Sequence, residues 1–254
     1  MDARAPDPRD RDLADYGEQY RKLPFEPLQA AYRRRLVLSR VRAHDPARLL
    51  EVGCAELPLF LDLPGREHVV VEPTEAFAAR AREQAAGRPD VLVVPALLED
   101  VGPGQVGGRF DLVVVSGLLH EVPDPVRLLG AARELCAPGG VVHVSVPNAR
   151  SLHRLLAVAM GLAASPDEES ATQRLLQQRT VYDEERLDDE LRRCGLRVRE
   201  RGSLLVKPFT HAQMQHLVDT GFLTTELLDG LDRLTAQLPG LGSEIWVDAE
   251  PVDA

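Results

Sequence analysis

Short apolar runs alternate with helix-type segments through the middle of the chain, and this alternation limits the possible fold more than any other feature. The segments at 74–87 and 123–140 have helical periodicity, and each ends at glycine. Strands interleaved with helices of this length form βαβ units, and runs rich in Val and Leu are typical of strands buried on both faces. The pattern therefore predicts an α/β fold with a Rossmann-like doubly wound sheet. The five expected strands are 47–52, 67–72, 91–95, 110–116 and 141–148.

The last hundred residues predict two further strands and several helices. We expect one strand at 196–206, broken or bulged near Gly202, and a final strand at 243–249. No ordinary crossover helix joins them, so the final strand should run antiparallel between the fifth strand and the strand at 196–206. The expected sheet is seven-stranded and mostly parallel. Helices before His44 and in the segments 151–180 and 208–240 should form a helical lid over the carboxyl ends of the strands.

The expected organisation is a short tail followed by one domain. Residues 1–12 are charged and contain proline, which is typical of a disordered tail, and 13–254 form a single domain. Within it we expect N-terminal cap helices at 13–45, a cofactor-binding core at 46–148 and a substrate side at 149–254. No signal peptide appears, and no apolar run reaches the ~20 residues of a membrane helix.

Charge and cysteine content limit the functional classes. The formal net charge is −10, which disfavours nucleic acid as a partner, because nucleic-acid affinity depends on basic groups. Cys54, Cys136 and Cys194 are far apart and form no CxxC pair, so neither a disulfide framework nor a zinc site is expected. The chain is predicted to be cytoplasmic and bound to no membrane.

Candidate site residues follow the expected strands, because ligands of doubly wound sheets bind beside the carboxyl ends of the strands. After the first strand, Gly53 and Ala55 are small enough for the backbone to approach a ligand closely. Glu72 ends the second strand about 20 positions later, where an acidic residue accepts hydrogen bonds from both hydroxyls of a ribose. These features indicate a nucleoside site.

In these segments the sequence resembles the class I S-adenosylmethionine (SAM)-dependent methyltransferase superfamily. The resemblance rests on "LLEVGCAELPLF", "VVVEP" and "FDLVVVSGLLHEVPDPVRLLGAARELCAPGGVVHVSVPN", and it covers residues 48–148 in the style of the ubiquinone-biosynthesis-like enzymes. The segments "VPNARSLHRLLA", "KPFTHAQM" and "LGSEIWV" resemble a subgroup found beside saccharide and secondary-metabolite genes. One departure is Leu57, which stands where the family has a third glycine and narrows the space beside the methionine moiety.

The resemblance implies SAM as cofactor and S-adenosylhomocysteine (SAH) as product. It places ribose and methionine contacts after the first two strands, adenine contacts after the third, and sulfonium contacts after the fourth. Two N-terminal side chains, Tyr20 and Arg34, would close over the cofactor, with Arg34 paired to its carboxylate. The implied cofactor-binding set is Tyr20, Arg34, Glu51, Gly53, Cys54, Ala55, Glu72, Pro73, Leu98, Glu99, Ser116 and Gly117.

Several of these residues have a structural alternative. Glu51 can cap a helix instead, and Tyr20 can be ordinary packing. Arg34 lies on or beside the inward face of its helix but can also be a surface charge, whereas Arg33 and Arg35 are expected to face water. Cys54 is read as a small turn residue and not as a nucleophile.

The catalytic candidates are histidines, because methyl transfer to a hydroxyl needs alignment and a base. His120 follows the fourth strand and His153 the fifth, and each has a structural alternative. His143 lies inside a strand and is expected to be a core histidine. Glu121, Asn148 and His211 are the candidate substrate contacts. No cluster with the spacing of metal ligands appears.

The sequence thus predicts a SAM-dependent methyltransferase acting on a small-molecule acceptor in secondary-metabolite or saccharide biosynthesis, with O-methylation slightly favoured over N-methylation. One alternative is a SAM-binding protein that transfers no methyl group, which Leu57 keeps open. Another is a nicotinamide oxidoreductase, disfavoured because GxGxxG and Tyr-x-x-x-Lys are absent. The chain is expected to be a monomer or a homodimer.

Overall fold

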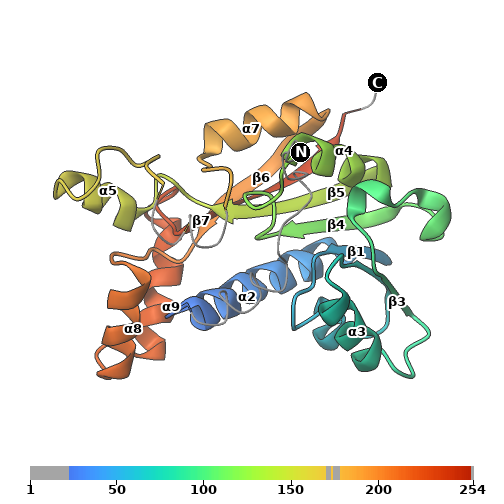
Figure 1. The fold of residues 1–254 in the computed structure, drawn as a ribbon, viewed down its shortest axis with the longest axis horizontal. Helices are drawn as coiled ribbons and strands as arrows, with labels where there is room; N and C mark the ends of the chain where they lie inside the picture. Colours follow the sequence, from blue (N-terminus) through green and yellow to red (C-terminus); the bar gives the residue numbers. More distant parts are fainter. Residues whose placement is uncertain (1–22, 170–172, 174–177, 253–254) are drawn as a thin grey trace, which may run out of the picture.

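A seven-stranded sheet with the order β3-β2-β1-β4-β5-β7-β6 forms the centre of the computed structural model, which describes residues 23–169, 173 and 178–252 (Figure 1). The first five strands are parallel, and β7 is antiparallel to both β5 and β6. The predicted fold, including the position and direction of the last strand, is confirmed. The strands are β1 (Arg48–Val52), β2 (Glu67–Val71), β3 (Val91–Val94), β4 (Phe110–Ser116), β5 (Cys136–Pro147), β6 (Leu196–Leu204) and β7 (Glu244–Pro251).

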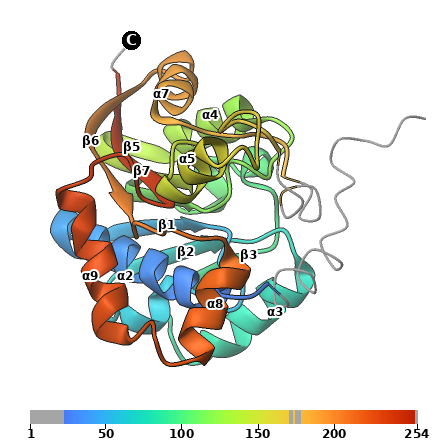
Figure 2. The same cartoon turned by 90° about the vertical axis from the view of Figure 1, so that its left-hand side faces the viewer.

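Helices cover both faces of this sheet (Figure 2). On one face lie α2 (Glu26–His44), α3 (Glu75–Gln84) and the 3-10 turn η1 (Leu59–Asp62); on the other lie α4 (Pro125–Leu135) and α7 (Glu184–Arg193). Adjacent strand residues point to opposite faces. Leu49 therefore packs with α2, and Leu50 packs with α4. This two-sided burial explains why the strands read as continuous apolar runs.

The ends of several helices carry the capping residues that the sequence suggests. Asp124 accepts a hydrogen bond from the Arg127 amide at the start of α4, and Asp183 does the same for Arg186 in α7. Thr74 stands at the N-cap position of α3, but its side chain makes no capping hydrogen bond. The remaining 3-10 turns are η2 (Leu98–Asp100), η3 (Pro103–Gln105) and η4 (Leu234–Ala236).

The irregularity of β6 differs from the prediction. The register shifts between Val198 and Glu200, not at Gly202, and the strand ends at Leu204. Gly202 has a packing role instead, because a Cβ atom there would lie 2.7 Å from the indole of Trp246 on β7. A glycine inside a strand can mark either a bulge or a place where another group approaches the backbone closely, and Gly202 marks the close approach of Trp246.

The helices after β5 and β6 divide between the two sides of the molecule. Helix α5 (Leu152–Ala159) lies beside the carboxyl end of β5, whereas α8 (His211–Asp219) and α9 (Thr225–Arg233) lie on the α2 side (Figures 1 and 2). Tyr32 of α2 packs with Met214 and Leu228 there. No helix in the described part of the chain is long and apolar enough to cross a membrane. The predicted tail at 1–12 and Tyr20 lie outside the described residues.

Candidate active site

A cavity of about 1390 Å³ lies at the carboxyl ends of the parallel strands. Its walls come from the loops after β1, β2, β4 and β5, from α2, from α5 and from residues 178–182. A single small-molecule site typically occupies about 300–1,000 Å³, so this cavity has room for a cofactor and a second ligand. Only Thr210 and His211 of the segment 208–240 line it, because α9 and most of α8 pack on α2. The helical lid is thus smaller than the sequence predicts.

The turn after β1 has the shape that a nucleotide-binding turn requires. Gly53 and Ala55 both have positive φ angles, of 73° and 47°, which carries the backbone sharply away from the strand. The Leu59 N–H donates a hydrogen bond shared by the two carboxylate oxygens of Glu51, at 2.9 and 3.1 Å, and Glu51 also lies 3.1 Å from His68 Nε2. The capping role that was one alternative for Glu51 is therefore present, at the start of η1.

Glu72 is held in the cavity by the backbone. Its Oε2 accepts a hydrogen bond from the Cys54 amide at 3.1 Å, and its Oε1 accepts one from Thr74 at 2.8 Å. The side chain is buried and lines the cavity. Each carboxylate oxygen can accept a further hydrogen bond, so the group is positioned to receive the two hydroxyls of a ribose. Burial raises the pKa of the neighbouring Cys54 thiol, which agrees with the turn role expected of that residue.

Apart from Tyr20, which lies outside the described residues, the remaining predicted cofactor contacts also line the cavity. Leu98 and Glu99 lie in η2, and Pro73 follows Glu72. Ser116 Oγ lies 2.8 Å from Ser145 Oγ at the end of β4. Gly117 has a φ of 67°, and a Cβ atom there would lie 3.4 Å from Cδ of Arg33.

Of the three consecutive arginines of α2, only Arg33 lies differently from the prediction, because Arg34 lines the cavity as its expected place on the inward face requires. Arg34 stabilises the turn after β1. It donates hydrogen bonds to the carbonyls of Leu57 and Pro58 and to the Asp62 carboxylate. Arg33 was expected to face water, but its side chain is only 18 % exposed and lines the cavity. Arg35 is half-exposed, as its place on the outer face suggests, yet it pairs with Asp229 and Asp232.

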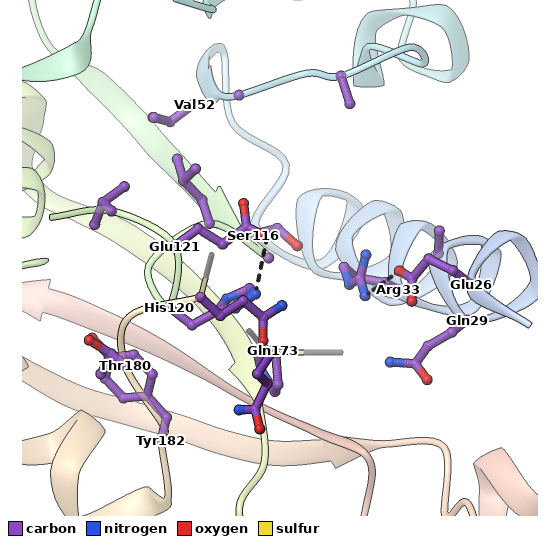
Figure 3. A pocket seen from close by; sticks show the side chains of 18 of the residues that line it. Glu26, Gln29, Arg33, Val52, Ser116, His120, Glu121, Gln173, Thr180 and Tyr182 are labelled. Carbon is purple, nitrogen blue, oxygen red and sulfur yellow. Dashed lines mark hydrogen bonds and ion pairs between the residues drawn. The ribbon is translucent and has the colours of Figure 1, made fainter. Parts of the chain in front are cut away.

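The Arg33 prediction was wrong because helix α2 is enclosed on two sides. It packs on the sheet through Val37 and Val41, and on α8 and α9 through Tyr32. The cavity occupies a third side, where the polar residues Glu26, Gln29 and Arg33 lie at i, i+3 and i+7. That polar stripe was the available signal in the sequence. Figure 3 shows these three side chains projecting from α2 into the cavity, with His120 and Ser116 on the other side.

The three candidate histidines all line the cavity. His120 is buried, with its Nε2 3.5 Å from Glu121 Oε1, and its carbonyl accepts hydrogen bonds from the Arg179 and Thr180 amides. Burial, together with the positive charge of Lys207, lowers the pKa of His153 to about 2 and that of His211 to about 3. His153 and His211 are therefore neutral at physiological pH.

Asn148 and His143 have structural partners. Asn148 donates to the carbonyls of Gly240 and Gly242 and accepts from the Arg150 amide, so it joins the end of β5 to the loop before β7. His143 is fully buried in β5, as predicted, and its Nδ1 lies 2.7 Å from the Asp248 carboxylate.

Lys207 is a cavity residue that the sequence did not single out. It is 3 % exposed, and its Nζ donates a hydrogen bond of 3.2 Å to Gln29 Oε1. Burial lowers its pKa to about 8, against the opposing effect of Glu26 and Glu244. Within residues 23–169, 173 and 178–252 no His, Cys, Asp and Glu side chains are grouped to hold a metal ion.

Comparisons with known proteins identify the family of this chain. A methyltransferase domain family matches residues 20–201. A ubiquinone biosynthesis O-methyltransferase of Azotobacter vinelandii (strain DJ / ATCC BAA-1303) is 32% identical over 114 residues, which are 44% of this chain and 49% of that protein. The chain therefore spans about half the length of the curated relative that it matches.

Solved structures share the fold at low sequence identity. The 1,6-didemethyltoxoflavin-N1-methyltransferase of Burkholderia thailandensis, solved with 1,6-didemethyltoxoflavin and SAH bound, aligns over 100% of this chain and 94% of its own, with a TM-score of 0.60 and 14% identity. The [4+2]-cyclase SpnF aligns over 82% of this chain and 75% of its own, with a TM-score of 0.51 and 16% identity. With its family match over most of the chain, this protein belongs to the methyltransferase domain family and carries a class I SAM-dependent methyltransferase domain.

Proposed function

We propose that this protein transfers the methyl group of SAM to a hydroxyl group of a small molecule in secondary-metabolite or saccharide biosynthesis. The observation that carries the proposal is the single cavity, in which the turn after β1 and Glu72 form one part and α2, α5 and residues 178–182 form another. Walls on several sides favour a small acceptor over a polymer, because they separate the reacting groups from water.

The cofactor residues of the proposal are those that line the cavity after β1, β2, β3 and β4. Glu72 would hold the ribose, Gly53, Cys54 and Ala55 the methionine moiety through their backbone, and Leu98 and Glu99 the adenine. Ser116 and Gly117 would lie beside the sulfonium. The enzyme would then act mainly by alignment, since methyl transfer is an in-line displacement that depends on the position of the acceptor.

The first test is binding of the cofactor. Calorimetry should show SAM and SAH binding with micromolar dissociation constants, roughly −8 kcal/mol. Binding of NADH without SAM would overturn the proposal in favour of an oxidoreductase.

The second test is methyl transfer. The protein is incubated with SAM and a panel of phenols, sugars and amines, and SAH and methylated products are followed by mass spectrometry. A methylated hydroxyl compound supports the proposal, and methylation of amines alone would correct it to N-methylation. Binding of SAM with no product from the panel or from a cell extract would favour the non-methyltransferase alternative, for which Leu57, exposed at the cavity wall, is the structural reason.

A further inference from the structure

Five polar side chains line the cavity between α2 and the segment that follows β6, and Glu244 lies buried behind them. These side chains surround Lys207. The cofactor contacts proposed above include none of them. We call this group the Lys207 cluster. Its members are Glu26, Gln29 and Arg33 of α2, Lys207, His211 of α8 and Glu244 of β7.

The hydrogen bonds of Gln29 determine which atoms of this cluster donate. Gln29 Nε2 donates to Glu244 Oε1 at 2.7 Å, and a carboxylate can only accept. Gln29 Oε1 therefore faces Lys207 Nζ at 3.2 Å and His211 Nε2 at 3.0 Å, and both of these atoms donate to it. His211 thus carries its proton on Nε2, and one N–H of Lys207 is engaged.

Lys207 has no ion pair in the described part of the chain, although it is almost completely buried. Glu244 pairs instead with Arg33, whose Nη2 lies 2.6 Å from Glu244 Oε1. Arg33 also pairs with Glu26 at 3.2 Å (Figure 3). Burial destabilises the ammonium group of Lys207, whereas Glu26 and Glu244 favour it, so its pKa falls to about 8 and part of the side chain is a neutral amine near neutral pH. A neutral amine has a free lone pair, with which Lys207 can accept a proton from a ligand in the cavity.

The cluster lies next to the expected site of methyl transfer. Arg33 contacts the position where Gly117 would carry a Cβ atom, and Gly117 is the proposed neighbour of the sulfonium. Arg33 binds Glu244, and Gln29 joins Glu244 to Lys207. His153 of α5 lines the same cavity, and the positive charge of Lys207 contributes to its lowered pKa.

We propose that Lys207 is the general base that removes the hydroxyl proton of the acceptor during methyl transfer. This inference rests on the proposed function. The acceptor oxygen forms a bond to the methyl carbon while the bond between that carbon and sulfur breaks, and its electron pair stays on sulfur to give SAH. The hydroxyl proton moves to Nζ of Lys207, which becomes an ammonium group. The positive charge lost from sulfur thus reappears on Lys207, where Glu26 and Glu244 stabilise it.

The other basic groups around Lys207 fit this role less well. His153 and His211 have pKa values of about 2 and about 3, so they take up a proton only weakly near neutral pH. A base works best with a pKa near the working pH, and that of Lys207 is about 8. His120 also lines the cavity, where its Nε2 lies 3.5 Å from Glu121 Oε1 and its charge favours ionised Glu244.

The deciding experiment compares the protons released when SAM and SAH bind. The sulfonium of SAM is positively charged and SAH lacks that charge, so SAM should lower the pKa of a nearby Lys207 further. Calorimetry at pH 8 in buffers of different ionisation enthalpy measures this release. We expect SAM to release about 0.2–0.5 proton more than SAH. Lys207→Met and Lys207→Arg should both abolish the difference, and Arg192→Met, on the exposed side of α7, should preserve it.

The outcomes separate this inference from the proposed function. If neither ligand binds the wild-type protein, the proposed function fails. If both bind with equal proton release, or if the difference survives in a folded Lys207→Met variant, the base is not Lys207. With the acceptor from the methyl-transfer screen, Lys207→Met should lower kcat about 100-fold or more while the SAH dissociation constant stays the same. An unchanged kcat would also overturn the inference.

Discussion

Two glutamates at the ends of neighbouring strands have different roles, and their backbone partners explain the difference. Glu51 accepts a hydrogen bond from the Leu59 amide and lies 3.1 Å from His68 Nε2, so it stabilises the turn itself. Glu72 is fixed by two amides of the cavity wall, those of Cys54 and Thr74. At the residue scale, Glu72 is therefore the carboxylate most suited to bind the cofactor.

Replacing Glu72 should weaken cofactor binding. We expect Glu72→Ala to raise the SAH dissociation constant by about tenfold to a hundredfold, on the order of 1.5–3 kcal/mol, because a charged acceptor for two hydroxyls is lost. Calorimetry measures the constant, and circular dichroism checks that the variant is folded. Glu75→Ala, on the exposed first turn of α3, is the matched control and should bind as the wild type does. Equal affinity of a folded Glu72→Ala variant would exclude Glu72 as the ribose anchor.

At the scale of elements, a glycine in β6 leaves space for a large side chain of the neighbouring strand β7. Trp246 lies across from Gly202 in the register, and its indole covers the glycine. The guanidinium of Arg40 on α2 lies 4.7 Å from the centre of the Trp246 ring. Helix, strand and edge strand are thus packed around one aromatic side chain, which leaves no space for a methyl group at residue 202.

Two glycine substitutions should change stability in opposite directions. Gly202→Ala should destabilise the protein by about 1–3 kcal/mol, because its Cβ would overlap the indole of Trp246. Gly230→Ala should stabilise it by about 0.5–1 kcal/mol, because Gly230 lies within α9 and a Cβ there meets nothing within 4 Å. Urea unfolding measures both. Similar stability of Gly202→Ala and the wild type would show that Trp246 moves aside.

At the scale of the whole molecule, Asp248 joins three elements that are distant in the sequence. It lies on β7 and accepts hydrogen bonds from Arg40 of α2 at 2.6 and 2.9 Å. His44 of α2 and His143 of β5 lie 2.6 and 2.7 Å from its carboxylate. Burial opposes ionisation of Asp248, but these three partners outweigh burial and hold its pKa well below the usual range.

Stability should therefore depend on Asp248 and on pH. A depressed folded-state pKa contributes stability above the unfolded-state pKa of about 3.9, and this contribution is lost as the pH falls through the folded-state value. We expect Asp248→Asn to lower the free energy of unfolding by about 3–5 kcal/mol at pH 7, because basic partners are left without their carboxylate. The difference between variant and wild type should shrink below about pH 4. Urea unfolding at pH 7 and pH 3 measures it; a difference independent of pH would contradict this role of the charge.

Much of the fold could be predicted from the sequence because it depends on local patterns. Apolar runs marked the strands, and the missing crossover helix after Lys207 placed the antiparallel strand β7. The small residues Gly53 and Ala55 marked the sharp turn, and Glu72 followed at the spacing of a ribose-binding carboxylate. These features can be recognised in the sequence because the geometry of strands and turns is determined by residues that are close along the chain.

Only the tertiary structure decided which polar side chains meet in the cavity. Arg33 reaches it as Arg34 does, because α2 is packed on the sheet and on α8 and α9, and periodicity of apolar residues identifies one buried face at a time. Lys207 lies in a segment that reads as the end of a strand, and Gln29 is far from it in the sequence. Their contact, and the burial that lowers the pKa of Lys207, depend on elements that come together only when the chain folds.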